Sequence, residues 1–244
     1  EVLQCFVGGK DTGRYLTDLY VDGVFFTGSN RVGNIIASKC SGRFQRLVFE
    51  LGGKDAVYVA GDVDVDKAAT SLVSGAFYNA GQSCCSVERI YVEQKIYDNF
   101  LESFCSRVKN LSIGDPFSSD TDIGPLARSE QIYILDKHLY DAKHKGAEVI
   151  FEQPPFQKGY FYNPNVVTKV NHEMLMMREE SFGPIVGVCS TKSDAQAKHY
   201  ISDTSYGLTA GIYTRDQQRA ENFLKDIDTG TVYWNCCDRV SASL

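Results

Sequence analysis

Short apolar runs alternate with amphipathic segments along most of the chain, and this alternation limits the possible folds more than any other feature. The apolar runs are rich in β-branched and aromatic residues and cover 23–28, 56–61, 89–93, 147–152, 185–191, 208–214 and 230–235. The segments with apolar residues at helical spacing cover 62–81, 94–111, 129–147, 193–202 and 216–228. Strands that alternate with helices predict an α/β fold, with a mostly parallel, twisted sheet and flanking helices.

Three irregular stretches interrupt this pattern, at 113–125, 152–170 and 178–184. The first is rich in turn-forming residues, the second contains three prolines and the third ends in Gly-Pro. Functional sites of α/β proteins lie on such loops at the ends of strands. We therefore expect the site of this protein on loops of this kind.

Size and charge exclude several classes of partner. The 244 residues suit one large domain or two smaller ones. The formal net charge of −6 gives no electrostatic basis for binding nucleic acid or an anionic membrane surface. No uncharged apolar run approaches the roughly 20 residues that a membrane-spanning helix needs. We therefore predict neither a nucleic-acid partner nor a membrane partner.

Eight cysteines are spread irregularly, and the adjacent pair Cys84–Cys85 lies between a predicted helix and a predicted strand. No spacing resembles the paired motifs of a zinc site, so no metal site is predicted. Adjacent cysteines cannot easily bridge each other without backbone strain. Reduced, packed thiols account for most of the eight and indicate a reducing compartment, the cytoplasm or the mitochondrial matrix. For the pair itself, packing and nucleophilic roles both stay open.

Two glycine-rich turns and one acidic residue are further candidates. The stretches VGGKDTG (7–13) and FTGSNRVG (26–33) each precede a plausible helix, where bare backbone N–H groups can bind phosphate. Glu50 ends an apolar run, and burial there would raise its pKa and make it a candidate base. Tight turns without a ligand and a surface carboxylate explain the same residues equally well.

Four motifs, in order, give these positions a common explanation. The stretches FTGSNRVG, FELGGK, NAGQSCCSVER and EESFGP resemble the F-T-G-S-x-x-x-G, E-L-G-G-K, G-Q-x-C and E-x-F-G-P motifs of the aldehyde dehydrogenase superfamily. Glu50 and Cys84 lie 34 positions apart, which fits the spacing of acid and nucleophile in that family. The stretch GTVYWN (230–235) resembles a further family segment, so the resemblance extends over nearly the whole chain.

The resemblance implies a role for each motif residue. It implies that Cys84 is the nucleophile, as the cysteine of G-Q-x-C, and that Glu50 is the general base. The other implied contacts are to cofactor and substrate: Gly28, Ser29 and Gly33 at the pyrophosphate, Gly9 and Gly13 on the adenosine side, Glu180 at the nicotinamide ribose, Phe182 near the nicotinamide, and Asn235 near the substrate funnel.

The implied activity is oxidation of an aldehyde to a carboxylate through a thiohemiacetal and a thioester on cysteine, with hydride transfer to NAD. NADP stays open, because Arg31 adds a positive charge to the glycine-rich turn. An acylating enzyme that passes the thioester to coenzyme A and a catalytically silent scaffold of the same fold stay open as alternatives. A hydrolase or acyltransferase that pairs Cys84 with a histidine is a third.

The resemblance also implies a domain organisation. Residues 1–51 would form the C-terminal part of an incomplete NAD(P)-binding domain, and residues 52–244 the catalytic domain that carries the thiol. The chain would then be a fragment without the upstream oxyanion donor of the family, and we expect the fragment alone to be impaired or inactive. The full-length parent is expected to form a homo-oligomer and to act on a small aldehyde.

Overall fold

The chain divides into two compact units, Glu1–Gly52 and Gly53–Leu244. The computed structural model describes residues 2–151 and 159–237. The division lies one residue beyond the predicted domain boundary. The functions that the resemblance implies for the two units, cofactor binding and thiol catalysis, stay predictions.

The N-terminal unit contains a small parallel sheet whose two strands are joined by a helix. The elements are α1 (Lys10–Leu16), β1 (Gly23–Thr27), α2 (Asn30–Cys40) and β2 (Arg46–Glu50). The strands pair in parallel along their whole length, from Gly23 opposite Arg46 to Thr27 opposite Glu50. Ser29 caps α2, since its hydroxyl accepts a hydrogen bond from Val32 N at 3.4 Å.

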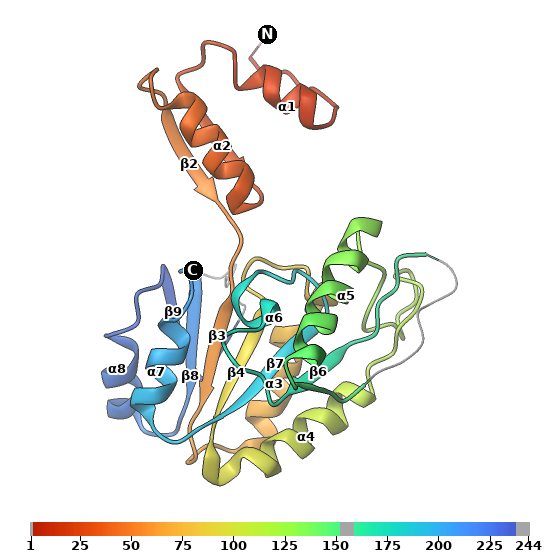
Figure 1. The fold of residues 1–244 in the computed structure, drawn as a ribbon, viewed down its shortest axis with the longest axis vertical. Coiled ribbons are helices and arrows are strands. Elements are labelled where there is room, and N and C mark those ends of the chain that lie inside the picture. Colours follow the sequence, from red (N-terminus) through yellow and green to blue (C-terminus); the bar gives the residue numbers. More distant parts are fainter. Residues whose placement is uncertain (1, 152–158, 238–244) are drawn as a thin grey trace. The chain divides into compact units, whose positions relative to one another are not determined.

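The C-terminal unit is built on a seven-stranded sheet (Figure 1). In spatial order its strands are β5 (Glu148–Val149), β6 (Asn165–Thr168), β7 (Ile185–Thr191), β4 (Val87–Glu93), β3 (Asp55–Val59), β8 (Thr209–Tyr213) and β9 (Thr231–Trp234). Every neighbouring pair is parallel except β5 and β6, which are antiparallel. This mostly parallel sheet with flanking helices confirms the predicted fold class.

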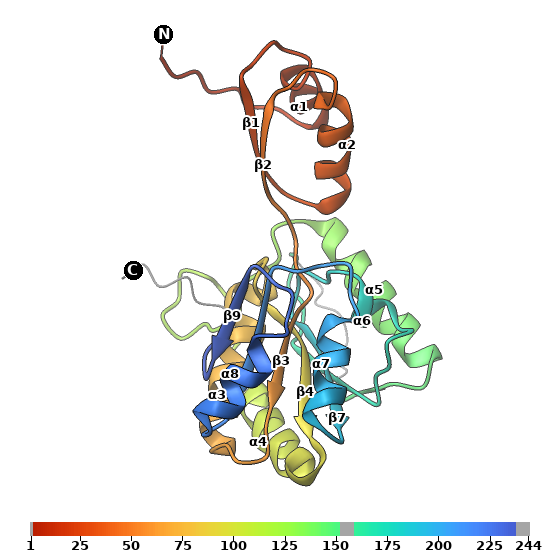
Figure 2. The ribbon, with the colours of Figure 1, turned by 90° about the vertical axis from the view of Figure 1, so that its left-hand side faces the viewer.

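Helices cover both faces of this sheet, as can be followed in Figures 1 and 2. The elements are α3 (Val65–Phe77), α4 (Tyr97–Lys109), α5 (Ser129–His144), α6 (Leu175–Arg178), α7 (Asp194–Ser202) and α8 (Gln217–Leu224). The connections β3–α3–β4 and β7–α7–β8 run in opposite directions across the sheet. Because such crossovers are right-handed, α3 and α7 lie on opposite faces. The strands between them are therefore enclosed, and every residue of β3 and β8 is buried.

Helix α3 is defined by its cap and by its small buried residues. The carboxylate of Asp64 accepts a hydrogen bond from Lys67 N at 3.2 Å and fixes the first turn. The buried face is made mainly of alanines with Leu72, Val73 and Phe77, so the helix backbone lies close to the sheet. A β-carbon at Gly75 would lie 3.2 Å from Val87 of β4, which shows how close this approach is.

Several sequence-based elements differ from the structure, and three of the differences have a clear physical reason. Strand β6 lies within the stretch 152–170, whose prolines obscured the short buried segment Asn165–Thr168. The helix predicted over 62–81 begins only after Asp64 and ends at Phe77, because the residues that follow have left-handed backbone conformations. The strand predicted over 147–152 comprises only Glu148–Val149, and residue 152 lies outside the described residues.

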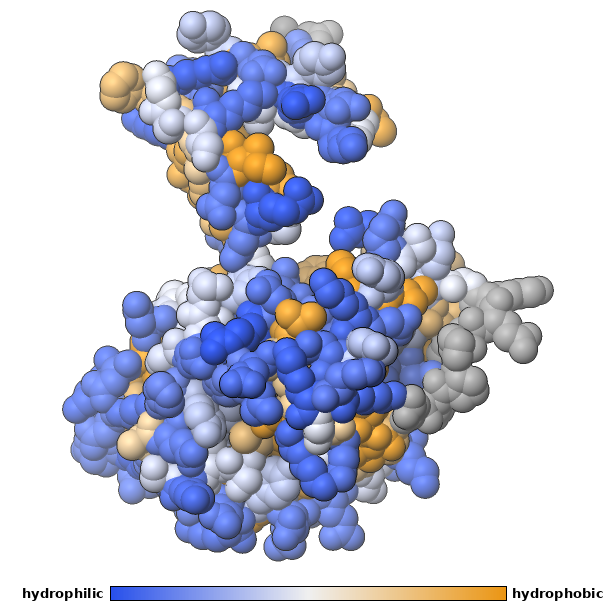
Figure 3. All heavy atoms as spheres, in the orientation of Figure 1, coloured by the Kyte–Doolittle hydropathy of each residue, from blue (hydrophilic) through white to orange (hydrophobic). Residues whose placement is uncertain are grey.

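The two units differ in surface character (Figure 3). In the N-terminal unit, large apolar side chains are strongly exposed, among them Phe25 on β1 and Phe44 before β2, with exposed fractions of 82% and 99%. The visible face of the C-terminal unit is mostly hydrophilic, and its apolar residues form one large core around β3 and β4. The core of the C-terminal unit therefore accounts for most of the buried apolar surface.

We expect the Phe104→Ala substitution to destabilise the C-terminal unit by about 3–5 kcal/mol, because it leaves a cavity in the core. Phe104 is fully buried and packs against Phe100 and Phe77, with ring centroids 5.6 and 6.2 Å away. Urea unfolding followed by the fluorescence of Trp234, the single tryptophan of the chain, measures the effect. The matched control is Phe117→Ala at a side chain that is 96% exposed, and equal unfolding midpoints for the two variants would contradict this description of the core.

Candidate active site

The loop that carries the paired thiols follows α3 directly. After the helix ends, Asn79, Ala80 and Gly81 adopt left-handed backbone conformations, with φ of 51°, 57° and 69°. This region is costly for a residue with a β-carbon such as Ala80, so the turn depends on the contacts that surround it. The chain then passes through Cys84 and enters β4. The segment 78–85 is called the thiol loop below.

Gln82 holds the thiol loop from two sides. Its side-chain Nε2 donates to Asn79 O at 3.1 Å, and Asn79 Nδ2 donates to Gln82 O at 3.0 Å. Its Oε1 accepts from Ala127 N, on the loop before α5, at 2.8 Å. The glutamine of the G-Q-x-C motif therefore stabilises the turn that presents the thiol, a role that the sequence analysis did not assign.

Cys84 is exposed and Cys85 is half-buried. Their sulfur atoms lie 3.8 Å apart, well beyond the roughly 2.05 Å of a disulfide bond. Two of the other cysteines, Cys40 and Cys237, are buried. Since a reactive thiol has to be accessible, exposure distinguishes Cys84 from these buried cysteines.

Two glycine contacts bring other motif segments against the thiol loop. A β-carbon at Gly53 would lie only 2.3 Å from Cys84 O, and a β-carbon at Gly81 only 2.3 Å from Gly183 O. Only glycine permits such close backbone approach. In addition, Gly53 N donates to Oε1 of Glu180 at 3.1 Å. Within the C-terminal unit, the last two residues of E-L-G-G-K, Gly53 and Lys54, therefore meet the G-Q-x-C and E-x-F-G-P segments next to Cys84.

A buried polar cluster lies under this meeting point. Lys54 and Glu88 form an ion pair with exposed fractions of only 1% and 2%. The Glu88 carboxylate also accepts from the backbone amides of Ser181 and Phe182. Arg89, equally buried, donates to Lys54 O at 2.9 Å and joins this cluster to the backbone at the end of α7. Every charge of the cluster is thus paired or hydrogen-bonded.

Two acids next to the thiol loop change their charge near neutral pH. Burial, together with the negative charge of Glu88, raises the pKa of Glu180 to about 7. Burial also raises the pKa of Asp55 to about 7, against the hydrogen bonds that it accepts from Thr209. Burial lowers the pKa of Lys54, and the Glu88 charge opposes this shift. The electrostatic state of this region therefore depends on pH between about 6 and 8.

In the N-terminal unit, the glycine-rich turn and Glu50 lie side by side. Thr27 is the pairing partner of Glu50, and Gly28 N donates to Glu50 O at 3.0 Å. Gly28, Ser29 and Glu50 are all exposed at the carboxyl ends of β1 and β2, with the N-terminus of α2 next to them. This edge is where α/β sheets bind ligands, and the free amides of a helix start suit a phosphate group.

The other predicted glycines have different surroundings. A β-carbon at Gly33 would lie 2.9 Å from Leu51 Cδ2, so close packing of α2 on the end of β2 explains this glycine. Nothing lies within 4 Å of the β-carbon positions of Gly9 and Gly13, which belong to α1 and its cap. The adenosine contact predicted for these two residues stays a prediction.

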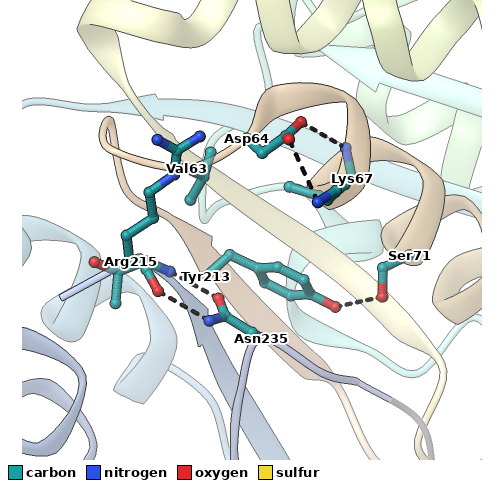
Figure 4. Close-up of a pocket in the computed structure, with 9 residues that line it drawn as sticks. Val63, Asp64, Lys67, Ser71, Tyr213, Arg215 and Asn235 are labelled. Atoms are coloured by element: carbon teal, nitrogen blue, oxygen red, sulfur yellow. Dashed lines mark hydrogen bonds and ion pairs between the residues drawn. The ribbon is translucent and has the colours of Figure 1, made fainter. Parts of the chain in front are cut away.

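The structure does not bring Asn235 to the thiol loop. Asn235 follows the carboxyl end of β9, whereas Cys84 precedes the amino end of β4 in the same parallel sheet. Its side chain binds the backbone of Thr214, since Oδ1 accepts from Thr214 N at 3.0 Å and Nδ2 donates to Thr214 O at 2.9 Å (Figure 4). With φ of 53°, Asn235 is the residue at which the chain reverses, and Cys237 then lies beside Gly75 of α3. The funnel role stays a prediction.

A cavity of about 440 Å³ lies between α3 and the ends of β8 and β9 (Figure 4). Its lining includes Ser71, Tyr213 and Asn235, and no residue of the thiol loop. The hydroxyl groups of Tyr213 and Ser71, both in the cavity wall, are hydrogen-bonded to each other at 2.7 Å. We therefore place the candidate site at the thiol loop, where the motif residues meet, and not in this cavity.

Two further findings concern the part of the chain that the structure describes. In residues 2–151 and 159–237, no group of three His, Cys, Asp or Glu side chains could hold a metal ion. Over the same residues, no helix has the length and apolar character needed to cross a membrane.

Comparison with known proteins identifies the family. The profile described as "Aldehyde dehydrogenase family" matches residues 1–244. The chain belongs to the aldehyde dehydrogenase family. Among curated relatives, the α-ketoglutaric semialdehyde dehydrogenase of Bacillus subtilis is 34% identical over 220 residues, which are 88% of this chain and 45% of the relative.

Solved structures of the aldehyde dehydrogenase family agree with this chain in fold as well. A putative aldehyde dehydrogenase from Anabaena variabilis matches with a TM-score of 0.90 and 34% identity, over 94% of this chain and 49% of that one. Betaine aldehyde dehydrogenase from Staphylococcus aureus in complex with NAD+ matches with a TM-score of 0.88 and 29% identity, over 92% and 46%. The chain thus spans about half the length of the relatives that it matches.

The raised pKa of Asp55 gives a pH prediction for this aldehyde dehydrogenase chain. Folded Asp55 keeps its proton up to about pH 7, whereas the unfolded chain loses that proton near pH 4, so the wild type loses stability as the pH rises between these values. We expect Asp55→Asn to gain about 2–3 kcal/mol relative to the wild type between pH 5 and pH 7, measured by urea unfolding.

The control for this measurement is Asp194→Asn. Hydrogen bonds from Arg219 lower the pKa of Asp194, so its contribution is present above the ordinary value of 3.8 and is lost only as the pH falls below it. The difference in unfolding free energy between this variant and the wild type should therefore stay constant from pH 5 to pH 7. The same constancy for Asp55→Asn would show that Asp55 is charged throughout this range in the folded state.

Proposed function

We propose that the protein oxidises an aldehyde to a carboxylate, with Cys84 as the covalent nucleophile and NAD as the hydride acceptor. The observation that carries this proposal is the convergence of three motif segments on one exposed thiol. Gly53, Gly81 and Glu180 fix the backbone around Cys84, while the thiol itself stays accessible. Membership of the aldehyde dehydrogenase family supports the same reaction.

The first half of the proposed reaction takes place on Cys84. The thiolate sulfur adds to the carbonyl carbon of the aldehyde, and the electron pair of the C=O bond moves to oxygen, which gives a tetrahedral thiohemiacetal. When the C=O bond re-forms, the carbon–hydrogen bond breaks and the hydrogen leaves as hydride. The carbon, now oxidised, stays attached to Cys84 as a thioester.

The second half hydrolyses the thioester. In the proposal, Glu50 takes a proton from water, the oxygen of that water adds to the thioester carbon, and the carbon–sulfur bond breaks. The products are a carboxylate and the regenerated Cys84 thiol. The position of Glu50 at the carboxyl end of β2, with an exposed side chain, is compatible with access to water.

Taken separately, each unit has residues that suit one part of a nicotinamide dinucleotide. Gly28 and Ser29, just before α2, would border the pyrophosphate, with the backbone N–H of Ser29 as the donor, since Gly28 N already donates to Glu50 O. Glu180 would accept hydrogen bonds from a ribose hydroxyl, and Phe182 would contact the nicotinamide ring. When bound, the cofactor supplies the carbon that accepts the hydride. The NAD+ complex of the related betaine aldehyde dehydrogenase supports this assignment.

The alternatives differ in the fate of the thioester. An acylating enzyme would transfer the acyl group to coenzyme A, and the presence of Glu50 disfavours it. A silent scaffold would form no thioester, and the exposed thiol of Cys84 disfavours this. A hydrolase or acyltransferase would need a histidine at the thiol. Of the four histidines, His138 and His172 are committed elsewhere, to Ser181 and to Asp203 with Tyr91.

We expect the Glu50→Gln variant to accumulate an acyl group on Cys84 when NAD and an aldehyde are added, because water is no longer activated. Propanal, succinate semialdehyde and benzaldehyde make a suitable panel, and peptide mass spectrometry locates the acyl group. Cys84→Ser should reduce labelling by about 100-fold or more. The matched control, Cys85→Ser, should label to within about threefold of the parent variant.

p-Nitrophenyl acetate separates the two parts of the proposal, since it can acylate a nucleophilic thiol without a cofactor. Acylation of Cys84 by this ester but not by aldehyde with NAD would show a working thiol without a working cofactor site in this chain. Release of the acyl group by coenzyme A faster than by water would favour the acylating enzyme. Failure of both reagents on a folded chain would contradict the assignment of Cys84.

A further inference from the structure

The segment Glu180–Gly183 has a backbone shape that needs support. Phe182 has a φ of 47°, in the left-handed region that residues with a side chain seldom adopt. Phe182 is only half-buried, so packing of its ring alone does not fix the backbone. The same segment carries the two residues proposed to contact the nicotinamide half of the cofactor. Something in the structure has to hold this conformation in place.

Glu88 supports this turn by accepting hydrogen bonds from two consecutive backbone amides, those of Ser181 and Phe182. Its Oε1 accepts from Ser181 N at 3.0 Å and from Phe182 N at 2.9 Å, and its Oε2 accepts from Ser181 N at 2.9 Å. A carboxylate that accepts from consecutive amides fixes the direction of both peptide planes. Glu88 lies in β4, four positions after Cys84, so the loop that carries the thiol leads directly into the strand that carries this support.

Lys54 makes the buried carboxylate possible. Its Nζ pairs with Glu88 Oε2 and donates to Ser181 Oγ at 3.0 Å. An unpaired charge at this depth would be strongly unfavourable. Lys54 also directly follows Gly53, whose amide donates to Glu180. The pair therefore joins three segments: one before β3, one in β4 and the turn that carries Glu180 and Phe182.

Stability alone does not explain this ion pair. Replacing a buried ion pair by apolar residues of similar volume is often neutral or stabilising. Apolar residues at positions 54 and 88 cannot accept hydrogen bonds from Ser181 N and Phe182 N, whereas the Glu88 carboxylate accepts from both. Further contacts from α5 reach the same turn, since His138 Nδ1 lies 3.2 Å from Ser181 Oγ, but they do not touch the amide of Phe182.

We propose that Glu88, with its charge balanced by Lys54, is a positioning residue that orients Glu180 and Phe182 for the nicotinamide half of the cofactor. This inference rests on the proposed function for its purpose, and on the hydrogen bonds of Glu88 for its mechanism. Glu88 does not touch the reacting atoms. It fixes the backbone from which the two cofactor residues project.

Two double variants test the role of the acceptor, independently of charge. Lys54→Met with Glu88→Leu removes both charges and the acceptor, and Lys54→Met with Glu88→Gln removes both charges but keeps an oxygen for the two amides. We expect the leucine variant to exchange the amide hydrogens of Ser181 and Phe182 roughly tenfold faster or more, without a similar rise in the rest of the C-terminal unit. The glutamine variant should exchange them at nearly the wild-type rate.

Hydrogen exchange with mass spectrometry measures the loop, and urea unfolding measures global stability. Equal exchange at Ser181 and Phe182 in the two variants would overturn the proposal. So would faster exchange that is uniform over the unit and follows the unfolding midpoint, since it would indicate a structural role only. If the leucine variant does not fold, Lys54→Met with Glu88→Asn repeats the test. The asparagine side chain is one methylene group shorter than that of glutamine, so its oxygen lies farther from the two amides.

A titration with NAD, followed by protein fluorescence, separates this inference from the proposed function. If the wild type binds NAD, the leucine variant should bind it at least about tenfold more weakly, and the glutamine variant about as well as the wild type. Equal affinity in both variants would overturn the positioning role. If the wild type does not bind NAD, the cofactor assignment fails for this chain, and the exchange experiment alone decides whether Glu88 holds the turn.

Discussion

The candidate site depends on backbone segments that approach one another more closely than side chains would permit. Gly53 against the carbonyl of Cys84, and Gly81 against the carbonyl of Gly183, leave no room for a β-carbon. These contacts fix the thiol loop between the start of β3 and the turn before β7. The thiol is therefore presented by rigid backbone, while its own sulfur stays exposed. A side chain at either glycine would separate the segments that the proposed chemistry needs together.

Charge is distributed around this packing in two different ways. Lys54, Glu88 and Arg89 are buried, and each is paired or hydrogen-bonded, so they fix the geometry of the segments that they join. Glu180 and Asp55 lie at the border of the cluster, where burial raises the pKa of each to about 7. Glu180, the residue proposed to face the cofactor ribose, thus changes its charge near neutral pH. The buried cluster thus fixes the backbone of the proposed site, while the two acids beside it can change their charge when a ligand binds.

The sequence predicted the architecture well because strand and helix signals act locally. The buried runs of β3 and β8 and the caps of α3 and α8 are visible as apolar stretches and as aspartates at helix starts. The motif resemblance also predicted that the segments of Cys84 and Glu180 belong to one site. It did not predict Gln82 or Glu88 as supports, because their partners, Ala127 and Phe182, are far away in sequence and are bonded through backbone atoms that carry no sequence signal. Nothing in the sequence indicated that the Asn235 side chain binds the backbone of Thr214, and the funnel role implied by its motif stays a prediction.

The central claim is that Cys84 is the reactive thiol of a site that responds to NAD. Alkylation of the intact chain with iodoacetamide at neutral pH, quantified for each of the eight cysteines by peptide mass spectrometry, tests it most directly. Cys5 gives the reference rate for an exposed thiol, and Cys40 and Cys237 give the rates for buried ones. We predict that Cys84 reacts faster than Cys5 and that NAD changes the rate of Cys84 more than that of any other cysteine. A rate for Cys84 no higher than that for Cys5, unchanged by NAD, would contradict it.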